Sequence, residues 1–280
     1  MLADLIAVMD LETIEDNIFR GQSRDVGSPR VFGGQVLGQA LTAASRTVPD
    51  RQIHSLHAYF LRAGDVSAPI VYEVDRARDG RSFTNRRIIA IQHGQQIFNM
   101  TASFQVHEQG LEHQFPSPEV PPPDGIPDIT EIRAAAESMP RKVRDFLSRR
   151  RPFHMRLAGL ASSDDGRIEP VKNVWMKAVD TLPDDPHLHQ ALLAYISDYE
   201  LLGTATLAHG TERLLRRKLQ MASLDHAMWF HRPCRVDDWL LFSFDSPSAS
   251  GSRGLARAEV FTRDGQLVAS LAQEGLIRVR

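Results

Sequence analysis

Asp198 is the residue whose type and position most strongly suggest proton-transfer chemistry. It follows an apolar run, residues 191–196, and helical spacing places it on a covered face of a helix. Burial penalises an ionised carboxylate and raises its pKa toward the range useful for a general base. The same carboxylate could instead hydrogen-bond a backbone group near the helix end. Residue type and position leave both roles open.

Ser223 lies in an expected strand, on the face opposite His226. A Ser–His pair between these residues is therefore not expected, and the chain contains no Gly-x-Ser-x-Gly motif. Because an unassisted serine is a weak nucleophile, Ser223 is better suited to orient a water molecule by a hydrogen bond. A hydrogen-bonded core serine is the alternative.

Gln273 lies in the last expected strand, on the same face as Leu267, Ala269 and Leu271. An inward amide thus follows three inward apolar groups. The amide takes no proton at neutral pH, but its oxygen accepts and its nitrogen donates hydrogen bonds. This suits a group that holds one water in line with a carbonyl. A buried glutamine bonded to neighbouring backbone is the other possibility.

The elements that must position these residues occur twice. A helix with apolar residues on nearly every side is expected at 34–41 and again at 189–196, an offset of 155. A strand with a His-Ala pair follows each helix, and alternating strands then lead to a two-residue turn at 93–94 or 264–265. A buried helix followed by antiparallel strands, twice, predicts an α+β fold in which a sheet curls around each helix. The two sheets are expected to join edge to edge.

The repeat also pairs individual positions. Ala43 corresponds to Asp198, His54 to Ser223, and Ser103 to Gln273. None of the three candidate residues is repeated, so one catalytic centre per chain is expected. His54 could contact substrate or have a structural role.

Prolines crowd the stretch between the halves, where alternation stops. We predict an N-terminal domain at 1–106, a proline-rich linker at 107–169 with one helix at about 130–149, and a C-terminal domain at 170–280 that carries the catalytic residues. A short amphipathic helix packed on the body is expected at the N-terminus. The linker prolines are Pro116, Pro118, Pro121, Pro122, Pro123 and Pro127.

Composition excludes several classes of protein. The chain has 280 residues, 42% of them hydrophobic, which is enough for a full core. With a net charge of −2, the chain has no overall positive field that would attract nucleic acid. The single cysteine, Cys234, excludes an internal disulfide and a cysteine-rich zinc site and fits a reducing compartment. No uninterrupted apolar window reaches the length of a membrane span, so no membrane partner is expected and a cytoplasmic location follows.

Five segments resemble the acyl-CoA thioesterase II family of double hot-dog enzymes. They are FRGQS at 19–23, VFGGQVLGQA at 31–40, YFLRAGD at 59–65, LDHAMWFHRP at 224–233 and QEG at 273–275. The match runs from about residue 14 to the C-terminus, and the linker is least similar.

The resemblance implies two fused hot-dog domains and a fatty acyl-CoA hydrolase without metal or cofactor. The family's site residues, an Asp, a Thr or Ser, and a Gln, fall on Asp198, Ser223 and Gln273. Bacterial relatives have Thr at the second position, so Ser223 keeps the hydroxyl but lacks the stiffening methyl. This affects the expected turnover rate more than the reaction type. Asp198 would take a proton from a water held by the other two residues.

Other functions remain as alternatives. Another hot-dog enzyme, a dehydratase or hydratase, would need a His with an acidic partner, and the helix of Asp198 contains no His suited to that role. A non-catalytic acyl-CoA-binding protein would tolerate the serine at 223. A pure interaction module finds support only in the linker. Because hot-dog sheets commonly associate, a homo-oligomer is expected.

Overall fold

The computed structural model describes residues 1–137, 139–163, 168–210, 214, 217 and 219–279. The chain forms two compact units, each built from several segments. Unit 1 comprises Met1–Gln114, Pro183–Tyr199 and Leu224–Arg235. Unit 2 comprises Phe115–Leu182, Glu200–Ser223 and the chain from Val236 onward. These units interleave along the sequence, and the predicted domain boundaries at 106 and 170 stay a prediction.

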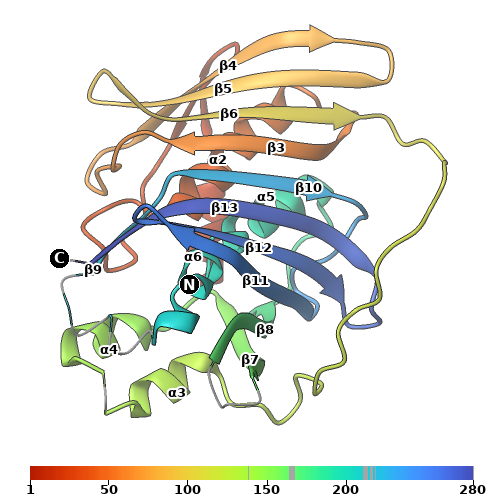
Figure 1. Ribbon diagram of the computed structural model, residues 1–280. Coiled ribbons are helices and arrows are strands. Elements are labelled where there is room, and N and C mark those ends of the chain that lie inside the picture. Colours follow the sequence, from red (N-terminus) through yellow and green to blue (C-terminus); the bar gives the residue numbers. More distant parts are fainter. Residues whose placement is uncertain (138, 164–167, 211–213, 215–216, 218, 280) are drawn as a thin grey trace. The chain divides into compact units, whose positions relative to one another are not determined.

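Unit 1 contains an antiparallel sheet in the order β1-β2-β4-β5-β6-β3-β10. In β5 every second residue from Thr84 to Gln92 is buried, which is the period of a strand with one covered face. Figure 1 shows β4, β5, β6 and β3 as successive neighbours. The strands are β1 (Glu12–Glu15), β2 (Ile18–Gly21), β3 (Gln52–Phe60), β4 (Ile70–Asp79), β5 (Phe83–Gln92), β6 (Gln95–Gln105) and β10 (Asp225–Phe230).

Three helices of unit 1 are α1 (Leu2–Met9), α2 (Gly33–Arg46) and α5 (Pro186–Ser197). α2 contacts β3, β4, β5 and β6, and it also packs along α5 (Figure 1). A Cβ on Gly34 would lie 2.2 Å from the carbonyl oxygen of Tyr195, and one on Gly38 would lie 2.9 Å from that of Ala191. Glycine therefore permits this close, antiparallel crossing.

The N-terminal helix was predicted correctly. α1 packs against α2 and buries Leu2, Leu5 and Met9, which share one helical face. Among the residues that the structure describes, no helix is both long and apolar enough to span a membrane.

Unit 2 contains an antiparallel sheet in the order β13-β12-β11-β8-β7, and β9 also pairs with β13. The short helix α6 (Leu201–Thr204) lies against β12, β11 and β13 and is followed by the 3₁₀ helix η1 (Leu207–His209). The strands are β7 (Phe153–Ser162), β8 (Ile168–Ala178), β9 (Leu219–Ser223), β11 (Leu240–Ser250), β12 (Arg253–Thr262) and β13 (Leu267–Val279).

One of the two predicted turns was correct. His93 and Gly94, with φ of 49° and 71°, form the whole connection between β5 and β6. The predicted two-residue turn at 264–265 is wrong, because residues 263–266 join β12 to β13. Only Gly265 has a positive φ there, 85°, whereas a two-residue turn of this type needs two such residues.

The predicted single helix at about 130–149 is wrong, since two helices occupy this stretch. α3 (Ile129–Ala135) and α4 (Arg141–Leu147) are separated by a segment that ends at Pro140. Proline has no N–H for an internal helical bond and disfavours helical geometry in the preceding residue. β7 follows, within the span that lacked recognisable alternation.

The proline-rich segment before α3 packs on the sheet of unit 2. The Trp175 indole N–H donates to the carbonyl oxygen of Pro121 at 2.9 Å. Val120 and Ile126 pack on the buried cluster of Trp175, Leu241 and Phe261. This part of the linker is therefore a covering layer of unit 2.

Buried charges tie α3 to β8 and to the start of α6. Arg133 and Lys172 both donate to the carboxylate of Glu200, at 2.7 and 2.9 Å. Burial alone would raise the pKa of Glu200, but the two cations outweigh it and hold that pKa below its ordinary value. Because each charge is compensated, removing one partner would leave a costly buried charge.

Candidate active site

Asp198 ends α5 and lies at the start of α2. It has φ −81° and ψ −6° as the C-terminal cap, and its Oδ2 accepts a hydrogen bond from the backbone N–H of Gly34 at 2.9 Å. A Cβ on Gly33 would lie 2.7 Å from Oδ2, so glycine leaves room for the carboxylate. The positive end of the α2 dipole stabilises a negative charge here. Asp198 therefore makes the backbone contact that one interpretation expected and is half-buried, and its role as a general base stays a prediction.

Aromatic rings surround this junction. Phe32, which precedes α2, stacks on Tyr199 with ring centroids 4.9 Å apart and meets Tyr195 edge-on at 5.1 Å. The two tyrosine hydroxyls lie 3.2 Å apart. Phe60 lies close to Gly33, because a Cβ there would be 3.1 Å from its ring. The carboxylate therefore stands beside a largely apolar wall, which the sequence analysis did not identify.

A buried hydrogen-bond chain supports the end of α5. The Ser197 hydroxyl donates to the carbonyl oxygen of Ala194 at 2.8 Å, and the His226 Nε2 lies 2.9 Å from the same hydroxyl oxygen. Since the hydroxyl hydrogen is already used, the His226 ring donates from Nε2. Burial lowers the pKa of His226 to about 4, so the ring is neutral near pH 7. His226 thus bonds to the neighbour of Asp198, in keeping with the expectation that it does not pair with Ser223.

Ser223 and Gln273 are brought together in unit 2. Ser223 in β9 lies opposite Gly275 in β13, so strand alternation puts Gln273 on the same face, two residues along. Diagonal neighbours of this kind are about 7–8 Å apart, within reach of a long side chain. A Cβ on Gly275 would lie 2.4 Å from Leu202 of α6, which shows that this face is the one covered by the helix. Gln273 is 1% exposed, as the predicted inward amide should be.

His54 contacts Ser103, the counterpart of Gln273 in the repeat. Its Nε2 lies 2.8 Å from the Ser103 hydroxyl, and its ring meets Phe83 edge-on at 5.5 Å. The register between β3 and β6 shifts between Ile53 and Ser55, so His54 stands at an irregularity of the strand. Burial lowers the pKa of His54. These contacts fit the structural role, and substrate contact stays a prediction.

Comparison with known proteins now decides the family. Residues 21–105 match the family model of the acyl-CoA thioesterase N-terminal domain, and residues 144–276 match that of acyl-CoA thioesterase. The chain is 42% identical to acyl-CoA thioesterase 2 of Haemophilus influenzae over 99% of its own length and 98% of that protein. The chain belongs to the acyl-CoA thioesterase family. This confirms the predicted family and the predicted class of enzyme.

Solved structures confirm the hot-dog fold of this thioesterase. Acyl-CoA thioesterase II TesB2 from Mycobacterium marinum is 44% identical, with a TM-score of 0.82 over 99% of this chain and 98% of that one. A hot-dog protein of unknown function from Alicyclobacillus acidocaldarius gives a TM-score of 0.79 at 22% identity, covering 99% of this chain and 98% of that chain. At that identity the likeness concerns the fold alone. The expected α+β, double hot-dog class is therefore correct.

Proposed function

We propose that the chain hydrolyses fatty acyl-CoA with a water molecule that Asp198 activates and that Ser223 and Gln273 hold. The observation that carries the proposal is the Asp198 carboxylate, fixed by the Gly34 N–H at 2.9 Å beside an aromatic wall. A half-buried carboxylate with a fixed orientation is a typical general base. The fatty nature of the acyl group is carried over from the family resemblance and fits the apolar surroundings of Asp198.

The chemistry needs one proton transfer and one displacement. Asp198 takes a proton from the bound water, the water oxygen forms a bond to the thioester carbon, and the bond from that carbon to sulfur breaks. The proton on Asp198 can then pass to the departing sulfur, so that fatty acid and coenzyme A thiol leave. Ser223 and Gln273 accept or donate the hydrogen bonds that keep the water in line with the carbonyl.

The α2 helix has two opposing effects on this reaction. Its N-terminal dipole favours the charged form of Asp198, which weakens the carboxylate as a base. The same dipole also favours negative charge that develops on the thioester oxygen near the helix start. A base of modest strength can therefore suffice where the oxyanion is stabilised in the same place.

The contacts of the histidines argue against the dehydratase alternative. Such an enzyme needs a His that can exchange a proton near neutral pH, and His226 is buried with a pKa of about 4. The other histidine raised by the repeat, His54, is held against Ser103. A cytoplasmic location and a homo-oligomeric state stay predictions from the sequence.

The test is thiol release from a panel of acyl-CoAs that span short, medium and long chains. Release that follows Michaelis kinetics with at least one chain length is expected. If no chain length gives release above the buffer rate, while direct binding of a thioether analogue is retained, the chain is an acyl-CoA-binding protein instead.

A further inference from the structure

The chain turns in an unusual conformation two residues after Asp198. Glu200 has φ 63° and ψ −16°, in the left-handed region that residues other than glycine, asparagine and aspartate rarely occupy. Only Asp198, Tyr199 and Glu200 stand between the end of α5 and the start of α6. Glu200 therefore sets how the chain turns from α5 into α6. Such a backbone conformation persists only where the surrounding structure holds it.

A buried ion cluster, made of Arg133, Lys172 and Glu200, holds this turn. Arg133 Nη2 donates to the two carboxylate oxygens of Glu200 at 2.7 and 2.9 Å, and Lys172 Nζ donates to one of them at 2.9 Å. The side chains of Lys172, Glu200 and Arg133 are only 6%, 10% and 15% exposed, so water screens these ion pairs little. The cluster thus fixes the Glu200 side chain to α3 and β8 and offsets the cost of its left-handed backbone.

Along the chain, this turn lies between two parts of the proposed active site. Before it, the Asp198 carboxylate accepts the hydrogen bond from the Gly34 N–H. After it, Leu202 of α6 packs on Gly275, where a Cβ would lie 2.4 Å from the leucine side chain. Gly275 is two residues from Gln273 in β13. The conformation of Glu200 therefore links the proposed base to the helix that covers the face of Gln273.

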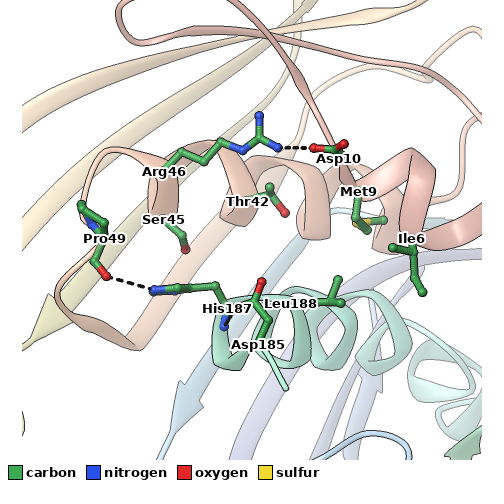
Figure 2. Close-up of a pocket in the computed structure, with 10 residues that line it drawn as sticks. All are labelled: Ile6, Met9, Asp10, Thr42, Ser45, Arg46, Pro49, Asp185, His187 and Leu188. Carbon is green, nitrogen blue, oxygen red and sulfur yellow. Dashed lines mark hydrogen bonds and ion pairs between the residues drawn. The ribbon is translucent and has the colours of Figure 1, made fainter. Parts of the chain in front are cut away.

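The far end of the α2–α5 pair is built differently. A cavity of about 520 Å³ lies there, lined chiefly by α1, the last turns of α2 and the first turn of α5 (Figure 2). The ion pair beside this cavity joins Arg46 to Asp10, whose side chain is 78% exposed, so water screens it. Ala43, the repeat counterpart of Asp198, is buried close by. A buried ion cluster thus accompanies the end with the proposed base, and a screened ion pair accompanies the other.

We propose that Glu200 is a positioning residue for hydrolysis, which acts through Asp198. Its contacts with Arg133 and Lys172 keep residue 200 in the left-handed conformation, and this conformation keeps the Asp198 carboxylate in line with the bound water. Glu200 itself touches neither the water nor the thioester. The inference rests on the proposed function of Asp198, and it assigns the effect to the backbone of residue 200, which the ion cluster supports.

Steady-state hydrolysis of one acyl-CoA by Glu200→Asn and Glu200→Gln tests this role. Both changes remove the charge, and glutamine keeps the length of glutamate, whereas asparagine adopts the left-handed conformation more readily. We expect kcat to fall at least about tenfold in Glu200→Gln, as for a slightly misplaced base. In Glu200→Asn, kcat should stay at least about threefold higher than in Glu200→Gln, with KM near that of the wild type in both. A kcat in Glu200→Gln that equals or exceeds that of Glu200→Asn would overturn the inference.

Two controls separate positioning from stability. If either variant fails to fold, as judged by circular dichroism, both are compared in a Lys172→Met background, which returns the cluster to its original net charge, and the same order is expected. Asp79→Asn also removes the partner of a buried cation, because Arg86 is 2% exposed. It should lower the melting temperature and leave kcat within about threefold of the wild type. A fall of kcat in Asp79→Asn as large as in Glu200→Gln would show that lost stability alone explains the effect.

Combination with Asp198→Asn separates this inference from the proposed function. If Glu200 acts through Asp198, Glu200→Gln should lower kcat by less than about threefold once residue 198 is already asparagine. The full loss in that background would overturn the positioning role and leave the proposed function intact. Near-normal turnover in Asp198→Asn alone would instead overturn the proposed function.

Discussion

At one end of the α2–α5 pair a carboxylate meets a backbone N–H, and at the other Leu188 lines a cavity close to the buried Ala43. Both ends are made by the same antiparallel crossing, which depends on Gly34 and Gly38. The packing therefore offers two related positions, and the side chain at each one determines whether chemistry can follow. At the Asp198 end the repeat position holds a proton acceptor, with a supporting chain through Ser197 and His226, and at the other end the same position holds Ala43.

The substitution with the largest expected effect removes the proton acceptor, the Asp198 carboxylate. Asp198→Asn keeps the size of the side chain and an oxygen for the Gly34 N–H, but the amide cannot take a proton from water. We expect the turnover number for acyl-CoA to fall roughly 10²–10⁴-fold with the fold intact. Asp50→Asn removes the same charge at an exposed position and should have little effect. Near-normal turnover in a folded Asp198→Asn protein would show that Asp198 is not the general base, and the catalytic difference between the two ends of the helix pair would be lost.

Acid should lower the free energy of unfolding, because His226, which supports the end of α5 beside Asp198, takes up a proton more readily in the unfolded chain. Burial lowers the His226 pKa from 6.5 to about 4, so between these values the unfolded chain binds the proton more readily. The stabilising contribution is complete above about pH 6.5 and is lost as the pH falls toward 4. We expect a loss on the order of 2 kcal/mol between pH 7.5 and pH 5 in urea unfolding.

His226→Gln should show a smaller loss over the same pH interval, and His113→Gln, at an exposed position, should behave as the wild type. An identical pH dependence in wild type and His226→Gln would show that the ring does not couple folding to pH.

The close packing of α2 against α5 can be tested by replacing a glycine at their crossing. A Cβ on Gly34 would lie 2.2 Å from a backbone oxygen of α5, so Gly34→Ala must push the helices apart. We expect a loss of about 1–3 kcal/mol in thermal unfolding and a lower rate of hydrolysis. Gly203→Ala in α6 has open space around the new methyl group and should be neutral or stabilising by up to about 1 kcal/mol. An unchanged melting temperature for Gly34→Ala would contradict the close crossing.

Substitutions at Ser223 test whether its hydroxyl holds the attacking water. If its hydroxyl orients water, Ser223→Ala should lower turnover roughly ten- to a hundredfold, about 1.4–2.7 kcal/mol, while Ser223→Thr retains or improves it. Steady-state hydrolysis of one acyl-CoA by the three proteins checks this order. Detection of an acyl adduct on Ser223 by mass spectrometry during turnover would replace the water mechanism with a covalent one.

Local patterns in the sequence predicted much of the fold. The apolar runs of α2 and α5, the alternation of β5 and the His93–Gly94 turn all depend on residues close together in the chain. The inward position of Gln273 followed from alternation in the same way. The break at Pro140 was also readable, because proline limits helices.

The surroundings of Asp198 could not be predicted in this way. Its contact with Gly34 joins residues 164 positions apart, and the His226–Ser197 bond joins two elements that no local period relates. The two glycines stood in a motif that resembled the family, but their function as spacers appears only when α2 and α5 are seen packed together. The cavity was missed for the same reason, since three separate helices line it.

The central claim is that one end of the helix pair is catalytic and the other is not. The most direct measurement is the number of catalytic equivalents per chain, found as the amount of a tight, slowly hydrolysed acyl-CoA analogue that is needed to abolish turnover of a good substrate. We predict about one equivalent, and we expect Ala43→Ser at the cavity end to leave the rate constant within roughly threefold of the wild type. Two equivalents per chain, or residual turnover in Asp198→Asn that disappears when His54 is also replaced, would contradict this account.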